Sequence, residues 1–493
     1  MTNGTDRPAL TIEGLTRQFI GGSWRDGSGE KQLRNIDPFD AEVLSTYPAA
    51  SLEDVDAAYR AADEARHGWR EMNTYQRRTV FEKAVAFVEE HHEEIVELIR
   101  QEVGGTALKA NFEIGLVIDI LKEAGTYPLR MEGKIMPSPI PDRENYLFRE
   151  PLGVVGVISP FNFPFFLSMK PVATALGAGN AVVLKPHEDT IVTGGALLAR
   201  IFEAAGLPAG ALNVILSDIP TIGDGFVEHP VPRAIVFTGS NALGAHVAEV
   251  AGRNLKKVLL ELGGNNAFIV LDDADLDLAV DAAVFSRFTH QGQICMSANR
   301  VLVQSGVRRE FEEKYLAKIE TLTVGDPGAA DTIIGPVINE RQATNLGGLV
   351  TRALDAGARP LIKGEVDGTL VHPTVLTDVT REMEVSRVEM FGPVVVLEEF
   401  EDDEDAVRIA NDSDFGLSGA VHTGDIERGM RIARKVETGM IHINDASIHD
   451  EPIIAFGGAK QSGFGRLNGQ WSLDEFTEMK WISVNRGRRQ FPY

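Results

Sequence analysis

Cysteine is almost absent from this chain, because Cys295 is the only one in 493 residues. A lone cysteine excludes an internal disulfide framework, and an unpaired thiol suits the cytoplasm, which is the location we expect. Basic residues are also scarce: 48 lysines and arginines stand against 72 aspartates and glutamates, a net charge of −24. Nucleic acids and anionic membranes bind positive surfaces, so we expect neither as a partner. Two explanations of this excess of acidic residues remain open. The host is adapted to high salt, or this is an ordinary acidic protein.

A long unbroken apolar run is missing too. The longest uncharged stretch covers residues 151–169, but prolines and glycines interrupt it. This composition indicates a strand, a loop and a helix start rather than a membrane span. The first residues, Met1–Pro8, lack the basic and apolar regions of an export signal.

The apolar spacing alternates between strands and helices over most of the chain, which predicts an α/β protein with parallel sheets covered on both faces. A strand pair is expected at Phe19–Ser28, and helices at Leu52–Arg70, Tyr75–Arg100 and Thr106–Gly125. Between Val154 and Leu260 the pattern predicts strands at 154–158, 181–184, 213–216, 234–237 and 257–260, and helices at 165–176, 192–205 and 242–253. After Gly263 it restarts, with elements expected at 268–271, 276–289, 300–303, 309–319, 382–400, 406–410 and 440–444. The proline-rich stretch Met131–Arg149 is predicted to leave the core as an arm.

A length of 493 residues predicts more than one domain. We place a boundary near Gly263, where the alternation of strands and helices restarts. The tail ends in a strand-like segment, Lys480–Val484, which has no obvious sheet partner nearby in the sequence.

No Gly-x-Gly-x-x-Gly motif marks a nucleotide site. Instead, Thr238-Gly239-Ser240 follows a predicted strand and opens a helix, where backbone N–H groups can receive a pyrophosphate or simply cap the helix. Lys185-Pro-His-Glu188 also follows a strand, and its charged ends are able to hold ribose hydroxyls. A solvated turn is the alternative for this segment.

Cys295 lies in the polar loop His290–Arg300, whose glycine and small residues are unusual for a core. The alternatives are a nucleophile and a buried small hydrophobe. Asn162, held between Pro160 and Pro164, and Glu261, beside paired glycines, each follow a predicted strand. These residues supply an oxyanion donor and a base to accompany the thiol.

Seven motifs occur in the order that aldehyde dehydrogenases use, and from Phe19 to about Val484 the chain resembles that family. They are Pro160–Pro164, Lys185–Glu188, Phe237–Ser240, Leu260–Asn265, Gln291–Cys295, Glu389–Pro393 and Phe456–Gly458 with Ser462-Gly463. The Ser168-Met169-Lys170 and His442-Ile-Asn444-Asp445 segments resemble the benzaldehyde and vanillin dehydrogenase branch.

The resemblance implies that Cys295 attacks an aldehyde to form a thiohemiacetal and then a thioester, which Glu261 hydrolyses by activating water. It implies that Asn162 and the Cys295 N–H hold the oxyanion. The cofactor is expected to be NAD, because Glu188 repels a 2′-phosphate, although His187 leaves NADP open. No metal is expected. The implied cofactor-binding residues are Ile158, Pro160, Phe161, Lys185, His187, Glu188, Gly223, Thr238, Gly239, Ser240, Leu262, Gly263, Glu389 and Phe391.

The substrate is expected to be an aromatic or medium-sized apolar aldehyde. The side chains expected to line its pocket are Phe163, Phe166, Met169, Ile294, Met296 and Phe456. An NADP-preferring semialdehyde dehydrogenase is the second hypothesis, and a catalytically silent binding protein with the same fold is the third.

One position departs from the family pattern. The lysine that most relatives place nine residues after the motif asparagine is replaced by Pro171, with Lys170 just before it. Lys170 is therefore either a proton-relay group or a surface residue of its helix. The resemblance also implies a Rossmann-like coenzyme domain over 1–130 and 150–262, an α/β catalytic domain over 263–470, and a small β arm formed by 131–149 and 471–493. This arm is expected to pair across subunits in a homodimer or homotetramer.

Overall fold

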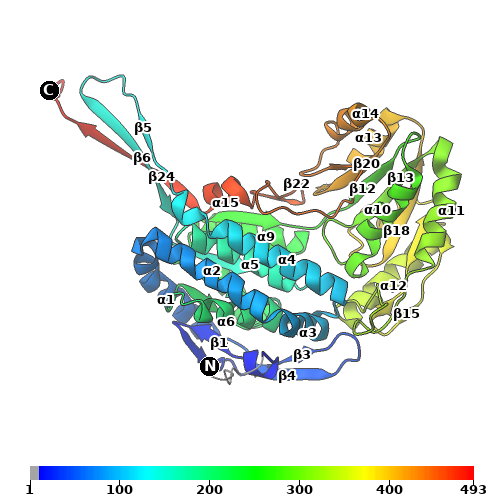
Figure 1. The fold of residues 1–493 in the computed structure, drawn as a ribbon, viewed down its shortest axis with the longest axis horizontal. Coiled ribbons are helices and arrows are strands. Elements are labelled where there is room, and N and C mark those ends of the chain that lie inside the picture. The colour runs from blue at the N-terminus through cyan, green and yellow to red at the C-terminus, as the bar shows by residue number, and fades with distance from the viewer. Residues whose placement is uncertain (1–9) are drawn as a thin grey trace, which may run out of the picture.

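The computed structural model describes residues 10–493, and the segment examined for an export signal lies outside them. Two α/β lobes face each other, and a narrow β arm leaves the first lobe (Figure 1). Each lobe is built on one large sheet, of eight strands in the first and seven in the second. The predicted α/β class, with a Rossmann-like part and a β arm, is confirmed.

The first lobe begins with short strands and four helices. These elements are β1 (Gln18–Ile20), β2 (Ser23–Arg25), β3 (Gln32–Ile36), β4 (Val43–Pro48), α1 (Leu52–Glu71), α2 (Thr74–Glu90), α3 (His92–Val103) and α4 (Ala107–Ala124). The prediction of one helix over 75–100 is wrong, because two helices form there and the chain breaks between them at His91. There the His91 N–H still bonds the Phe87 carbonyl, while the His91 side chain contacts the Glu94 carboxylate at 2.9 Å without capping a backbone N–H of α3.

The central sheet of the first lobe has the order β9-β8-β7-β10-β11, in which the chain starts in the middle and builds outward on both sides. These five strands are parallel, and this order is that of a doubly wound nucleotide-binding sheet. Its strands and helices are β7 (Val154–Ile158), α5 (Pro164–Gly177), β8 (Ala181–Lys185), α6 (Leu197–Ala204), β9 (Leu212–Val214), α7 (Ile219–Ile222), α8 (Gly225–Glu228), β10 (Ala234–Thr238), α9 (Asn241–Arg253) and β11 (Lys257–Glu261).

Both faces of this sheet are buried. Val155 and Val157 face the core formed with α4, α5 and α6, whereas Val154 and Val183 face the core formed with α1 and α9. The predicted helix over 192–205 is irregular at its start, because Val192–Ala196 is a π-helical turn. The buried Glu102 carboxylate accepts the Val192 N–H at 2.8 Å and so holds that turn.

The second lobe carries the sheet β14-β17-β18-β13-β12-β20-β21. Its elements are β12 (Asn266–Val270), α10 (Leu276–Phe288), β13 (Ala298–Gln304), α11 (Arg308–Ile319), α12 (Glu340–Asp355), β14 (Arg359–Ile362), β17 (Thr374–Thr377), β18 (Val394–Phe400), α13 (Asp403–Asn411), β20 (Gly419–His422), α14 (Ile426–Ala433) and β21 (His442–Ile443). Of the expected element at 382–400, the strand occupies the last seven residues, preceded by a 3-10 turn at Glu384–Ser386. Short ladders pair β15 (Val366–Asp367) with β16 (Leu370–Val371) and β19 (Phe415–Gly416) with β22 (Ala459–Lys460).

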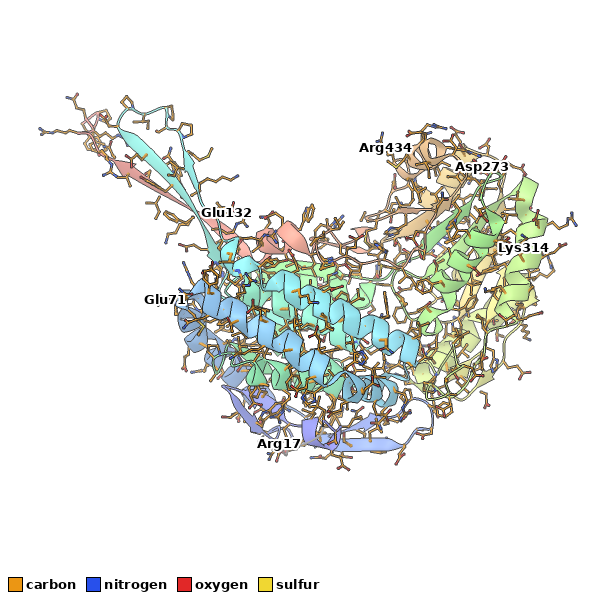
Figure 2. The ribbon with its side chains drawn as sticks, viewed as in Figure 1. Arg17, Glu71, Glu132, Asp273, Lys314 and Arg434 are labelled. Atoms are coloured by element: carbon orange, nitrogen blue, oxygen red, sulfur yellow. The ribbon has the colours of Figure 1, made fainter. Side chains whose placement is uncertain are left out.

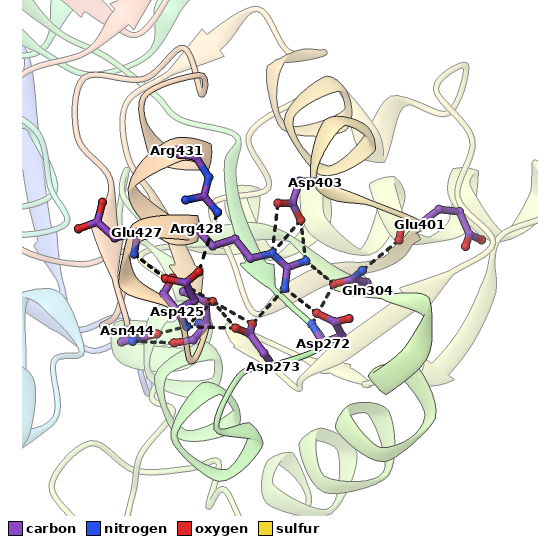
Figure 3. Close-up of polar contacts among 11 residues, drawn as sticks. Asp272, Asp273, Gln304, Glu401, Asp403, Asp425, Glu427, Arg428, Arg431 and Asn444 are labelled. Atoms are coloured by element: carbon purple, nitrogen blue, oxygen red, sulfur yellow. Dashed lines mark hydrogen bonds and ion pairs between the residues drawn. The ribbon is translucent and has the colours of Figure 1, made fainter.

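An ion-pair cluster ties the outer end of this sheet to its helices (Figure 3). The Arg428 guanidinium, on α14, lies 2.6 Å from Asp403 at the start of α13 and 2.6 Å from Asp272 after β12. It also donates to Gln304, the last residue of β13. These partners raise the pKa of Arg428, with the hydrogen bond to Asp403 the largest cause. The cluster thus joins two strands and two helices.

The arm is a three-stranded sheet in the order β24-β6-β5 and ends near the C-terminus (Figure 1). Its strands are β5 (Lys134–Met136), β6 (Arg143–Pro151) and β24 (Thr477–Asn485). Glu132 marks the place where the arm leaves the first lobe, far from Asp273 and Lys314 of the second (Figure 2). Just before the arm, α15 (Gly469–Glu475) and β23 (Gly463–Phe464) return to the first lobe, where β23 pairs with β11.

No helix within residues 10–493 combines the length and the hydropathy that crossing a bilayer requires.

Candidate active site

The thiol loop sits between the two sheets. Cys295 follows a turn in which His290 and Gln291 have φ of 49° and 57°, a strained left-handed backbone for residues with side chains. Asn266, the first residue of β12, donates from its amide to the carbonyls of Cys295 at 2.7 Å and Ser297 at 2.8 Å. Because Asn266 follows β11 by a few residues, the connection between the lobes itself holds the loop.

Asn162 reaches the same loop from the first lobe. It lies between the end of β7 and the start of α5, is 4% exposed, and donates from its side-chain amide to the Gln293 carbonyl at 2.9 Å. Its amide nitrogen carries a second N–H, which this bond does not use. The predicted oxyanion donor and the predicted nucleophile are therefore brought together.

Glu261 ends β11 and is 8% exposed. Among the described residues its Oε2 atom has no hydrogen-bond partner. Burial raises the pKa of Glu261 to about 8, and the charges of Lys170 and Asp450 act on it in opposite directions. Such a carboxyl group is able to exchange a proton near neutral pH.

The Cys295 thiol is partly exposed but surrounded by protein. Burial raises its pKa, and the negative charges of Glu389 and Glu261 raise it further, whereas Lys170 lowers it. These influences favour the protonated thiol, so attack requires a base that takes its proton.

Most of the implied cofactor-binding residues lie at the carboxyl edge of the first sheet, at or just beyond the ends of its strands. Ile158 pairs with Lys185 across β7 and β8, and Thr238 pairs with Glu261 across β10 and β11. The Lys185 ammonium is buried and lies 3.2 Å from the Glu188 carboxylate. The alternative of a solvated turn is therefore wrong for Lys185.

The remaining members of this set surround that edge. Gly239 donates its N–H to the Glu261 carbonyl at 3.1 Å, and Ser240 stands at the N-terminus of α9 without capping it through its side chain. Gly223, with φ of 49°, precedes Asp224, whose carboxylate lies 2.7 Å from His246 on α9. The turn at Gly223 is thereby held beside the same helix.

Glu389 and Phe391 approach from the second lobe. The Glu389 carboxylate accepts the Gly264 N–H at 3.0 Å. A Cβ atom at Gly263 would lie 2.4 Å from Glu389 Oε2, so any other residue there would displace the carboxylate from this position. The Phe391 ring meets that of Phe161 edge-on at 5.7 Å, and Phe161 likewise meets His187 at 5.2 Å. Burial raises the pKa of Glu389 to about 7.

The six side chains expected to line the substrate pocket belong to one apolar cluster, against which Cys295 also packs. They are Phe163, Phe166, Met169, Ile294, Met296 and Phe456. A cavity of about 390 Å³ opens beside this cluster, between Phe112 of α4, Phe285 of α10 and the segment 445–450. A larger cavity of about 550 Å³, near Leu10 and α2, includes none of the predicted site residues.

A thiol loop, an amide donor and a buried carboxyl group thus meet at the carboxyl edge of a doubly wound sheet. Residues 24–482 match the family model described as the aldehyde dehydrogenase family. The chain is 59% identical over 481 residues to benzaldehyde dehydrogenase YfmT of Bacillus subtilis, a match that covers 98% of this chain and 99% of the relative. This chain belongs to the aldehyde dehydrogenase family.

Two further members support the same placement. Vanillin dehydrogenase of Corynebacterium glutamicum is 47% identical over 473 residues, with 96% of this chain and 98% of the relative covered. The crystal structure of an NAD-dependent benzaldehyde dehydrogenase from Corynebacterium glutamicum superimposes with a TM-score of 0.88 at 44% identity, over 96% of this chain and 99% of the other. The resemblance to this aldehyde dehydrogenase branch is confirmed.

Sequence reasoning missed two buried ion pairs beside the site of this aldehyde dehydrogenase. Lys170 is 2% exposed and pairs with Asp450 at 2.8 Å, so its alternative as a surface residue is wrong. Lys109 pairs with Glu113 on α4, and the Glu113 carboxylate accepts the Phe166 N–H at 3.0 Å. The spacing of Lys109 and Glu113 by one helical turn was a usable signal.

Proposed function

We propose that this protein oxidises an aromatic or medium-sized apolar aldehyde to the carboxylic acid, with NAD as the oxidant. The observation that carries the proposal is the meeting of the Cys295 loop with the Asn162 amide and the Glu261 carboxyl group. These three residues are the proposed catalytic residues.

Cys295 acts as the nucleophile. Once deprotonated, its sulfur attacks the aldehyde carbon and the carbonyl oxygen takes up the negative charge of a thiohemiacetal. The second N–H of Asn162 and the backbone N–H of Cys295 stabilise that oxygen, a contribution worth roughly 2.7–4 kcal/mol for each donor. NAD, when bound, supplies the acceptor for the hydride that leaves this carbon.

Glu261 acts on the thioester that remains on Cys295. Its deprotonated form takes a proton from water, and the resulting hydroxide displaces the sulfur to release the acid. A pKa of about 8 leaves the carboxylate accessible near neutral pH and makes it a stronger base than an exposed glutamate. A carboxylate here favours water over coenzyme A as acyl acceptor.

The residues at the carboxyl edge fit NAD chemically. Lys185 and Glu188 offer a donor and an acceptor for the adenosine ribose hydroxyls, and Glu389 offers an acceptor for those of the nicotinamide ribose. The set that we propose to surround the pyrophosphate and the ring comprises Ile158, Pro160, Phe161, Gly223, Thr238, Gly239, Ser240, Leu262, Gly263 and Phe391. Glycine at 263 lets the Glu389 carboxylate approach this edge, because a Cβ atom there would meet it.

Two residues beside the proposed adenosine ribose site, Glu188 and His187, favour NAD over NADP. The Glu188 carboxylate lies where a 2′-phosphate would add a second negative charge. His187, which left NADP open, is partly buried, and this burial lowers its pKa despite the nearby Glu188 and Asp189 carboxylates. A neutral imidazole gives little attraction for a phosphate.

The test is NADH formation by the purified protein with benzaldehyde, vanillin, acetaldehyde and succinic semialdehyde, each with NAD or NADP and with or without coenzyme A. We expect turnover of the aromatic aldehydes with NAD, unchanged by coenzyme A. Cys295→Ser lowers that rate by about 10³-fold or more. Turnover of the semialdehyde alone, with NADP, would favour the second hypothesis. The absence of any turnover would favour a silent binding protein.

The arm belongs to the proposal as a homo-oligomer interface. It exposes apolar side chains that water disfavours, including Ile135 at 77% and Trp481 at 63%. Pairing of two arms covers them and gives a homodimer or homotetramer. Ile135→Lys should lower the mass measured by light scattering, whereas Leu255→Lys, at a position 95% exposed outside the arm, should leave it unchanged.

We also propose a coenzyme domain over 1–130 and 150–262, a catalytic domain over 263–470, an oligomerisation arm over 131–149 and 471–493, and a cytoplasmic location. The free thiol that the reaction requires supports this location. Separate expression of the arm-deleted chain should leave NAD binding intact if the division is correct.

A further inference from the structure

Lys170 and Asp450 form an ion pair in the apolar wall of the site. The Lys170 side chain is 2% exposed and the Asp450 side chain 4%. The Lys170 ammonium lies 3.6 Å from the centre of the Phe456 ring and 5.5 Å from that of Phe166. Burying two charges costs solvation free energy, and apolar residues of similar size often stabilise a protein as well or better. The pair therefore calls for an explanation other than stability.

Asp450 is held by two hydrogen bonds and lies at the wall of two cavities. One carboxylate oxygen accepts from Lys170 and the other accepts from the Asn468 amide at 2.7 Å. Asp450 lines both the cavity of about 390 Å³ and a second cavity of about 420 Å³. Each carboxylate oxygen has capacity for a further hydrogen bond, so this group is a preorganised acceptor for a ligand.

The rest of the smaller cavity suits an aromatic ring. Phe112, Phe285 and Ile448 are among its walls. The Phe112 ring packs edge-on against Phe163 at 6.2 Å, next to Asn162. The cavity therefore adjoins the inner site. Asp450 is close enough for its charge to act on Cys295, but it makes no hydrogen bond with that thiol among the described residues.

We propose that Asp450, held in place by Lys170 and Asn468, accepts a hydrogen bond from a hydroxyl group at position 3 or 4 of the aromatic ring of the aldehyde. The position follows from the distance between the two groups, because the aldehyde carbon has to reach Cys295 while Asp450 acts on that thiol through its charge and not through a hydrogen bond. A hydroxyl group at position 2 would lie beside the aldehyde carbon. The hydroxyl binds in its neutral form, since a phenolate would meet the carboxylate with like charge. This inference rests on the proposed oxidation of aromatic aldehydes.

The experiment compares kcat/KM for benzaldehyde, 4-methylbenzaldehyde and the three hydroxybenzaldehydes, at a pH below the ionisation of the phenols. The wild type should prefer the 3- or 4-hydroxy compound to benzaldehyde and to the methyl compound. The double variant Lys170→Met/Asp450→Leu removes both charges together and leaves none unpaired. In it the ratio of hydroxylated to plain substrate should fall by about tenfold or more. Asp450→Asn should lower the same ratio less, because an amide oxygen still accepts.

Asp445→Asn is the matched control, since Asp445 lines the same cavity without bonding Lys170, and its ratio should equal that of the wild type. Thermal unfolding shows whether each variant folds, and if the double variant does not, Asp450→Asn carries the test. An unchanged ratio, an equal loss for every aldehyde, or an effect confined to the 2-hydroxy compound would each overturn the inference. If the wild type oxidised none of these aldehydes, the proposed function itself would fail.

Discussion

The Glu261 carboxyl group of the active site and the carboxylates around Arg428 differ in how their charges are neutralised. Around Arg428 the carboxylates of Asp272 and Asp403 are one-half and one-third exposed and bond the guanidinium directly. Glu261, in the cleft, is buried with one oxygen lacking a partner among the described residues. The first arrangement joins elements together, whereas the second keeps a proton available. Burial without a partner thus distinguishes the chemical group from the structural one.

The largest effect that tests this difference is expected from Glu261→Gln. The amide cannot take a proton from water, so release of the acid should slow by about 10²–10⁴-fold. The thioester should then accumulate, and a single burst of NADH should precede a slow steady rate. In the wild type, acid release should accelerate as pH rises through about 8, where Glu261 loses its proton. A variant that kept the wild-type steady rate would remove Glu261 from the mechanism.

Asn162→Ala should have the next largest effect. Loss of one oxyanion donor lowers kcat by about 10²–10³-fold. Binding of NAD, followed by quenching of protein fluorescence, should stay close to that of the wild type. Equal losses of NAD binding and turnover would indicate that Asn162 supports the fold of the loop through Gln293 instead.

A third test uses stability rather than rate. The folded protein holds a proton on Glu261 up to a pH of about 8, whereas the unfolded chain releases it near 4.5. This group therefore makes the wild-type free energy of unfolding fall as pH rises through that window. Glu261→Gln removes this contribution, so the variant should gain stability relative to the wild type as pH rises. Denaturant unfolding at several pH values measures the difference; parallel curves would mean that Glu261 is not held protonated.

The smallest effect is expected at the structural cluster. Arg428→Met should lower the free energy of unfolding by about 1 kcal/mol, since the lost pairs are partly exposed. Its kcat/KM should match that of the wild type. Arg434→Met, an exposed arginine of the same lobe, is the control and should change neither quantity. A loss of activity in the Arg428 variant would contradict a purely structural role for this cluster.

Much of this layout could be predicted from local patterns. The apolar runs identified the parallel strands, and motif order placed Cys295, Glu261 and Asn162 in one site before any distance was known. The break at His91 could not be predicted, because apolar spacing continues through it from α2 into α3. The Lys170–Asp450 pair could not be predicted, because 280 residues separate its members and no local pattern around either residue indicates the other.

The last strand has a consequence for how the protein is made. β24 pairs with β6 along its whole length, with Thr477 opposite Pro151 and Asn485 opposite Arg143. Likewise β23 covers the edge of β11, the strand that ends in Glu261. While the chain emerges from the ribosome, β11 and β6 stay open on these sides until residues 463–464 and 477–485 have been translated. A prematurely terminated chain therefore exposes unpaired strand edges, a signal that chaperones and proteases are able to recognise before any active enzyme exists.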